Sequence, residues 1–307
     1  MSISVAFPFE SRFVTVQGTP MHYIDEGQGR PFVFLHGNPT WSYLWRNVIP
    51  PMRSQARCIA LDLVGFGRSG KPRIGYTFLE HYRYVAGFME ALNLRDAVLV
   101  GHDWGGVLGF YYALHHRENV AGMAFMETFP FTFKWDDFPR DFRLAFRLFR
   151  TPGIGHFLIM GLNLFVNKLI PASVYRGISD DIHENYRKPF PTFRSRYPIY
   201  VWPNELPVEG RENETFCGIK KIERSLNEFT FPMLLFTCSP GGVVGEEKVA
   251  WFKERIQDLT IEDLGPGIHY VQENNPWDIS RGILRWAACK NLLADYELDR
   301  AIIPKGA

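Results

Sequence analysis

An acidic residue stands between small residues where an apolar strand pattern passes into a helical pattern. The sequence AVLVGHDWGGVLGF occupies residues 97–110 and places Gly101, Asp103 and Gly105 two positions apart. Small residues on both sides allow a tight, strained strand-to-helix turn that exposes the central side chain, which is usually a serine nucleophile. The helix N-terminus at such a turn stabilises an anion. The alternative is that Asp103 only caps the following helix.

A carboxylate at this turn implies different chemistry from a serine. It can displace a leaving group from an sp3 carbon and form an alkyl ester on the enzyme. Water must then attack the carbonyl of that ester, so the second step needs a general base and an oxyanion hole. Among the nine histidines, His269 in GPGIHYVQENNPW has the best placement for this base, because it follows the last predicted strand and precedes the last predicted helix.

The base needs a carboxylate that orients it. Glu127 stands at the end of the apolar run GMAFMETF, where a buried acid is costly unless a cationic or hydrogen-bonding group pairs with it. The loop after the run FPMLLFTC offers no acid before Glu246. We therefore expect Glu127 to be the catalytic acid, with Glu246 as the weaker candidate.

Two neutral side chains with N–H groups border the expected turn. Asn38 lies in HGNP after the strand pattern PFVFL, in the loop that supplies one oxyanion-hole N–H in such sheets, and Trp104 follows Asp103. An amide and an indole can hold a small departing anion without a cation that would quench the nucleophile. The alternative is that Trp104 packs in the core and Asn38 shapes a turn.

These residues are spaced along alternating strand and helix patterns. Short apolar runs alternate with helical periodicity up to about Phe129, which predicts a mainly parallel sheet covered by helices. Between about Phe129 and Gly210 there is no convincing strand, and the aromatic content rises to 17 of the 74 residues in 129–202. In 141–150 the three phenylalanines share one helical face. The patterns predict one α/β domain interrupted by a helical, aromatic insertion.

Composition excludes several classes of function. The formal net charge of +1 argues against a nucleic-acid partner, and no run of about 20 apolar residues is present to cross a membrane. The four cysteines form no CxxC pair or zinc spacing, so we expect neither a metal site nor a disulfide framework. The start, MSISVAFPFESRFV, lacks signal-peptide features. We expect a cytoplasmic protein that is a monomer or a small homo-oligomer.

The chain resembles the haloalkane dehalogenases of the α/β-hydrolase superfamily in motifs that occur in the same order: HGNPTWSYLWRNVIP, DLVGFGRSGKP, GHDWGG, MET and GPGIHYVQENNP. The similarity is weakest across the insertion. GHDWGG alone is shared with epoxide hydrolases, whereas the pair HGNP and DWGG is more specific. The resemblance implies an α/β-hydrolase fold with a mostly parallel eight-stranded sheet, helices on both faces and an inserted helical cap. It implies a core domain over 1–129 and 211–307 and a cap over 130–210.

The resemblance also assigns roles by position. It implies Asp103 as nucleophile, His269 as base, Glu127 as acid, and Asn38 with Trp104 as halide ligands. Other branches of the family use an Asp after the seventh strand, which this sequence lacks. A small apolar halogenated substrate would be hydrolysed to alcohol and halide without a cofactor. The expected pocket residues are Trp202, Pro203 and Leu206, together with Phe133, Phe142, Phe146 and Phe165 of the insertion.

Other activities share parts of this pattern. An epoxide hydrolase needs acidic donors, typically two cap tyrosines, and usually has an aromatic residue at the position of Asn38. A fluoroacetate dehalogenase would need an arginine near the turn, where Val107 and Leu108 stand instead. A coelenterazine-type luciferase has a closely similar set of five residues, so the motifs leave this oxygenase open. A binding protein without catalysis would have no need of the complete set.

Overall fold

The computed structural model describes residues 3–138 and 140–293 of the chain. Its centre is an eight-stranded sheet with the order β1-β2-β4-β3-β5-β6-β7-β8, in which β2 pairs antiparallel with β1 and β4 and all other pairs are parallel. This confirms the expected mostly parallel sheet. The strands are β1 (Arg12–Val16), β2 (Thr19–Glu26), β3 (Pro31–Leu35), β4 (Arg57–Leu61), β5 (Ala97–His102), β6 (Val120–Met126), β7 (Met233–Pro240) and β8 (Leu259–Gly267).

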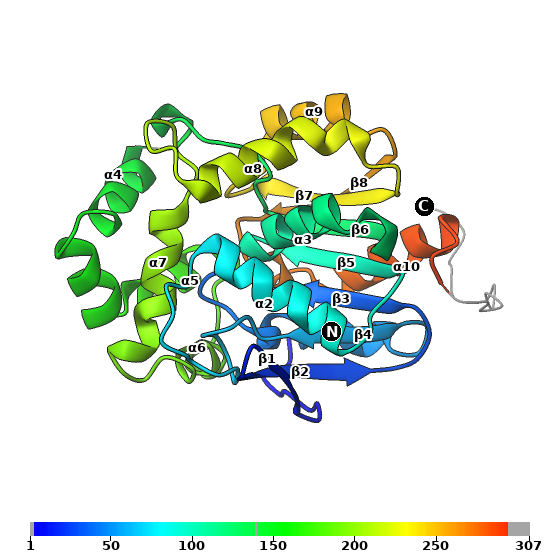
Figure 1. Ribbon diagram of the computed structural model, residues 1–307, viewed down its shortest axis with the longest axis horizontal. Coiled ribbons are helices and arrows are strands. Elements are labelled where there is room, and N and C mark those ends of the chain that lie inside the picture. Colours follow the sequence, from blue (N-terminus) through cyan, green and yellow to red (C-terminus); the bar gives the residue numbers. More distant parts are fainter. Residues whose placement is uncertain (1–2, 139, 294–307) are drawn as a thin grey trace.

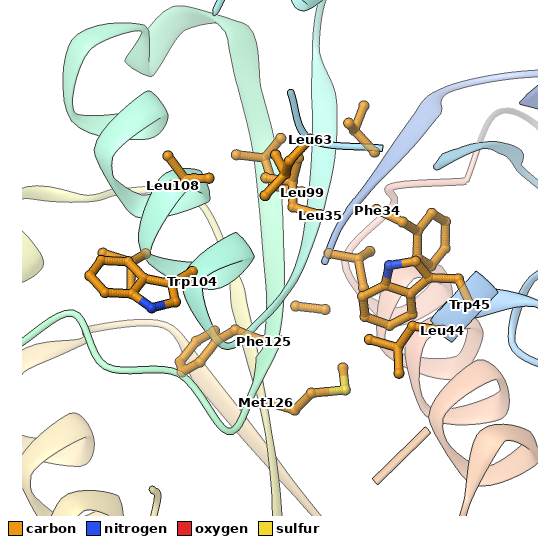
Figure 2. Close-up of a cluster of buried hydrophobic side chains, with 14 of the residues drawn as sticks. Phe34, Leu35, Leu44, Trp45, Leu63, Leu99, Trp104, Leu108, Phe125 and Met126 are labelled. Atoms are coloured by element: carbon orange, nitrogen blue, oxygen red, sulfur yellow. The ribbon is translucent and has the colours of Figure 1, made fainter. Parts of the chain in front are cut away.

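The middle of the sheet forms the core of the molecule. All residues of β5 are buried, and in β3, β4 and β6 only one residue each is partly accessible. Strands of a parallel sheet are buried on both faces and therefore read as continuous apolar runs. Figure 2 shows Leu35 and Leu99 between Trp104 and Leu108 on one side and Trp45 on the other. The ends of the central strands are therefore anchored in a tightly packed apolar core.

Helices cover both faces of this sheet (Figure 1). Helices α2, α3 and α8 pack against one another, and α1 packs against α10. Thr77 and Glu80 form a capping box at the start of α2, as their spacing favours. The helices of these layers are α1 (Ile49–Met52), α2 (Phe78–Ala91), α3 (Trp104–His115), α8 (Glu214–Ser225), α9 (Glu246–Arg255) and α10 (Pro276–Cys289), with short turns η1 (Ser42–Trp45), η2 (Arg117–Asn119), η7 (Leu226–Glu228) and η8 (Val271–Glu273).

The segment between β6 and α8 has a different composition and structure. Its described residues form helices and loops, with a single β-bridge between Phe133 and Val208. Figure 1 shows α4 to α7 together beside one end of the sheet. Within the described part of the chain, no helix is long and apolar enough to cross a membrane. The elements of this segment are η3 (Trp135–Asp137), α4 (Arg140–Phe149), η4 (His156–Gly161), η5 (Phe165–Leu169), α5 (Ile170–Ala172), α6 (Asp180–Arg187), η6 (Arg194–Arg196) and α7 (Tyr197–Glu205).

Candidate active site

Asp103 occupies a strained turn between β5 and α3. Its φ of 52° and ψ of −131° lie in a region that residues other than glycine seldom adopt. The neighbouring chain leaves no room for larger side chains. A Cβ on Gly101 would lie 2.5 Å from the Cα of Gly106, and a Cβ on Gly105 would lie 2.2 Å from the carbonyl oxygen of Leu35. The small residues of the motif are therefore required by close backbone packing, and the turn presents the carboxylate at the end of the sheet.

Backbone N–H groups stabilise the Asp103 carboxylate. The N–H of Asn38 donates to Oδ2 at 2.8 Å, and the backbone N–H of Trp104 also stabilises the charged form. The carboxylate is nevertheless buried, with 8% of the residue exposed. Burial raises the pKa of Asp103 to about 6, although the charge of His269 and the two N–H groups lower it. The carboxyl group is thus ionised above about pH 6 and poorly solvated.

His269 lies between the carboxylates of Asp103 and Glu127. Its Nε2 is 3.8 Å from Oδ1 of Asp103, and its Nδ1 is 3.3 Å from Oε2 of Glu127. Burial alone would lower the pKa of His269, but the hydrogen bond to Glu127 and the charges of both acids outweigh it, so this pKa lies above its ordinary value. The carbonyl of His269 is bound by Nε2 of His102 at 2.9 Å, and its N–H donates to Ser173 at 3.1 Å. The backbone of His269 is therefore fixed by hydrogen bonds at both its carbonyl and its N–H.

Glu127 has the hydrogen-bonding partners that its buried position requires. Its side chain is 2% exposed and accepts from the N–H groups of Gly242 at 2.9 Å, Val243 at 2.8 Å and Val244 at 3.3 Å. These donors belong to the acid-free loop after β7. A Cβ on Gly242 would lie 3.0 Å from Oε2 of Glu127, so the loop approaches closely because glycine stands there. Glu246, the weaker candidate, is exposed at the start of α9 and is not among these partners.

The side chains of Asn38 and Trp104 lie next to Asp103 under the helical segment. Asn38 Nδ2 donates to the carbonyl of Ile199 in α7 at 3.4 Å, and its Oδ1 is buried with no hydrogen-bond partner among the described residues. The Trp104 ring lies 4.3 Å from the ring of Trp202 and 4.9 Å from that of Phe129. The two expected halide ligands therefore both contact α7, Asn38 through Ile199 and Trp104 through Trp202.

Some of the expected pocket residues lie near the Asp103 turn and others do not. Trp202 is fully buried against Trp104, and the rings of Phe133 and Phe129 are 5.3 Å apart, so Phe133 is one ring away from Trp104. Pro203 and Leu206 are buried at the end of α7. Three phenylalanines lie farther away, around α4, and are joined to Phe133 through the ring of Phe138: Phe165 is buried, Phe146 is partly buried, and Phe142 is 43% exposed.

Sequence reasoning missed Phe129 and Ile199. Phe129 directly follows the strand end that carries Glu127, so its proximity to the site could have been inferred. The carbonyl of Ile199 approaches Asn38 from across the insertion, and no local pattern indicates this contact. Within the described residues, no group of three or more His, Cys, Asp or Glu side chains could hold a metal ion.

A buried ion pair fixes the loop that follows His269. Glu273 forms two hydrogen bonds with Arg46, at 2.6 and 2.8 Å, and both side chains are 1% exposed. The hydroxyl of Tyr186, from α6, donates to the same carboxylate. Asn274 accepts from the N–H of Tyr175 at 3.0 Å. The helical segment therefore binds directly to the loop that carries the candidate base.

Comparisons with known proteins agree with one another. A family model described as the alpha/beta hydrolase fold matches residues 30–151. The chain is 42% identical over 277 residues to a haloalkane dehalogenase from Mesorhizobium japonicum, covering 89% of each, and 38% identical to one from Bradyrhizobium diazoefficiens, covering 93% of this chain and 96% of the other. The crystal structure of haloalkane dehalogenase DbeA from Bradyrhizobium elkani superposes with a TM-score of 0.90 at 37% identity, covering 92% of this chain and 99% of that one.

Proposed function

The chain belongs to the haloalkane dehalogenases, hydrolases of the α/β-hydrolase fold that act on carbon–halogen bonds, and we propose that it does so through an alkyl ester on Asp103. The observation that carries this proposal is the different surroundings of the two Asp103 oxygens. Oδ2 accepts from the backbone N–H of Asn38, whereas Oδ1 lies 3.8 Å from Nε2 of His269. Oδ1 is then the free nucleophile, and Oδ2 becomes the carbonyl oxygen of the ester.

In the first step, Oδ1 attacks the carbon in line with the carbon–halogen bond. The bond between carbon and oxygen forms as the halide departs with the bonding electron pair. We assign the stabilisation of the halide to the N–H groups of Asn38 and the Trp104 indole, which border the space under α7. Burial favours this step because a poorly solvated carboxylate is a stronger nucleophile.

In the second step, His269 removes a proton from water as the water attacks the carboxyl carbon of the ester. Negative charge then develops on Oδ2, at the 2.8 Å distance from the Asn38 N–H at which an oxyanion hole acts. Glu127 accepts a hydrogen bond from the Nδ1–H of His269 and so keeps Nε2 free as the base. Collapse of the intermediate releases the alcohol and restores Asp103.

We further propose that residues 130–210 act as a cap that keeps the site dry. The segment contacts the site through Ile199 at Asn38, Trp202 at Trp104 and Ser173 at His269. Each of these three contacts is made to a residue that we place in the chemistry at Asp103. An apolar cover of this kind suits an apolar substrate and excludes competing water from the first step.

The test is to stop the reaction after its first step. His269→Phe removes the base, so 1-bromobutane should alkylate Asp103 and leave a butyl adduct, seen by intact mass and located by peptide mapping. His115→Phe is the matched control, because His115 is exposed at the end of α3, and it should turn over without an adduct. If the His269 variant carries no adduct while the wild type releases bromide, the ester mechanism is wrong. Turnover of styrene oxide without bromide release would instead indicate an epoxide hydrolase.

A further inference from the structure

A second hydrogen-bonded chain of a serine, a histidine and an aspartate lies on the β1–β2 side of the sheet. His22, on β2, has Nδ1 at 2.8 Å from Oδ2 of Asp62, which follows β4. Its Nε2 is 3.1 Å from Oγ of Ser11, just before β1. The side chains of His22 and Asp62 are fully buried, whereas Ser11 is partly accessible. None of these residues takes part in the chemistry at Asp103.

The surroundings of Asp62 define where the hydrogens lie. Its carboxylate also accepts from the N–H groups of Ser42 and Arg68, both at 2.7 Å, so it is an acceptor in every contact. Burial would raise the pKa of Asp62, but the hydrogen bond from His22 and the N–H of Arg68 help to keep it below its ordinary value. Because Asp62 only accepts, Nδ1 of His22 donates to it, and in the neutral imidazole Nε2 is then the acceptor that faces the Ser11 hydroxyl.

A cation adjoins the same hydroxyl. Nη1 of Arg68 donates to Oγ of Ser11, and the guanidinium lies over the rings of Phe7 at 5.2 Å and Trp41 at 5.5 Å. A hydroxyl that accepts from Arg68 directs its own hydrogen to His22, which is the arrangement of a serine about to lose its proton. Phe13, 55% exposed, packs its ring 5.3 Å from that of His22 and gives the position an apolar border.

We propose that Ser11, His22 and Asp62 form a second nucleophilic site, separate from Asp103, that is modified by activated acyl and phosphoryl compounds. Oγ of Ser11 bonds to the carbonyl carbon or phosphorus as its proton passes to Nε2 of His22. The bond to the leaving group, an aryl oxide or fluoride, breaks and the leaving group takes the bonding electrons. Arg68 stabilises the charge that develops on the attacked group.

Because His22 is buried, we expect Ser11 to be modified once and not to be released by hydrolysis. Because Ser11 covers Nε2 and the ring is fully buried, water has no separate access to the base. The acyl or phosphoryl group on Ser11 is therefore long-lived, and the site behaves as a stoichiometric acceptor of activated esters with aromatic leaving groups. The apolar border of Phe13 and the cation of Arg68 suit this class of compound.

The experiment uses the full chain with Asp103→Asn, which removes the first nucleophile from the assay. The protein is treated with an alkyl fluorophosphonate and, separately, with p-nitrophenyl acetate, and peptides are mapped by mass spectrometry. One label per chain is expected, on Ser11. His22→Gln keeps a donor for Asp62 but no base, so labelling of Ser11 should fall by about 100-fold or more, the usual contribution of a general base. Thermal unfolding checks that this variant is folded.

Ser54, an exposed serine, is the matched control within the same chain. In the folded protein, Ser11 should be labelled at least about 100-fold faster than Ser54. The two rates should become equal in urea, because unfolding separates Ser11 from His22 and Asp62. This ratio decides the matter even where His22→Gln does not fold. Equal labelling of both serines in the folded protein, or unchanged Ser11 labelling in folded His22→Gln, overturns the proposal. Bromide release by the wild-type protein is measured separately, so neither outcome bears on the ester mechanism at Asp103.

Discussion

The charge of Asp103 is predicted to destabilise the fold that presents it. The folded carboxyl has a pKa of about 6, against an ordinary value of 3.8, because it is buried. A difference of one pKa unit is worth about 1.4 kcal/mol, so the ionised side chain lowers the free energy of unfolding by about 3 kcal/mol. The unfolded chain releases this proton at lower pH than the folded chain. The free energy of unfolding therefore falls as pH rises from about 4 to about 6, and above pH 6 the whole reduction of about 3 kcal/mol remains.

Replacing Asp103 by Asn should recover this free energy. The amide is neutral and nearly isosteric, it can still accept from the Asn38 N–H, and asparagine tolerates positive φ better than most residues. We expect the free energy of unfolding at pH 8 to rise by about 3 kcal/mol and the gain to fall towards zero at pH 4. Urea unfolding followed by tryptophan fluorescence at both pH values measures the difference, and intact mass checks that the amide survives.

Asp180→Asn is the matched control, since Asp180 is exposed at the start of α6. That variant should change the free energy of unfolding by no more than about 1 kcal/mol, the usual contribution of a charge to a helix N-terminus. A gain for Asp103→Asn that is absent at pH 8, or equal at pH 4 and pH 8, would refute the argument. Either result would show that the charge of Asp103 does not lower the free energy of unfolding.

Three further predictions concern the reaction and the cap. The rate constant of the bromide burst should fall as pH is lowered through about 6, because Asp103 must be ionised, and rapid mixing across pH measures this. Glu127→Gln should slow ester hydrolysis by about 1,000-fold or more while the burst persists, so the alkyl adduct accumulates, whereas exposed Glu246→Gln should match the wild type. Tyr186→Phe leaves a buried oxygen of Glu273 short of a donor and should lower the free energy of unfolding by about 1–3 kcal/mol in urea.

The Asp103 turn could be predicted from sequence because its requirements are local. An apolar strand, small residues two positions either side of the acid and a helical pattern all lie within 97–110. The structure adds the reason for each glycine. Gly101 lies against Gly106 of α3, and Gly105 lies against the carbonyl of Leu35 at the end of β3, the strand next to β5. Alternation predicts the mainly parallel sheet, and the expected strands and helices lie where the patterns indicate, but it does not predict the strand order, in which β4 lies between β2 and β3.

The faces of the helical segment could not be predicted in the same way. Phe142, Phe146 and Phe149 do share one face of α4, since their rings are neighbours, yet Phe142 is 43% exposed and Phe149 is buried. Periodicity identifies an apolar face but not what covers each part of it. The crossing of α7 over Asn38 and Trp104 depends on how the whole segment folds back on the sheet, which no short pattern encodes.

The sequence predicts that buried Glu127 has hydrogen-bonding partners, but it does not identify them. Its position in an apolar run predicts that some partner must compensate the buried charge, but not which one. The partners come from the loop after β7, because β6 and β7 are neighbours in register and their ends adjoin. There the glycines allow three N–H groups to converge on one carboxylate. A catalytic acid placed after β7 would occupy the loop that now supplies these N–H donors. Moving the acid from the end of β6 to the end of β7 therefore requires that a new set of donors replace this loop.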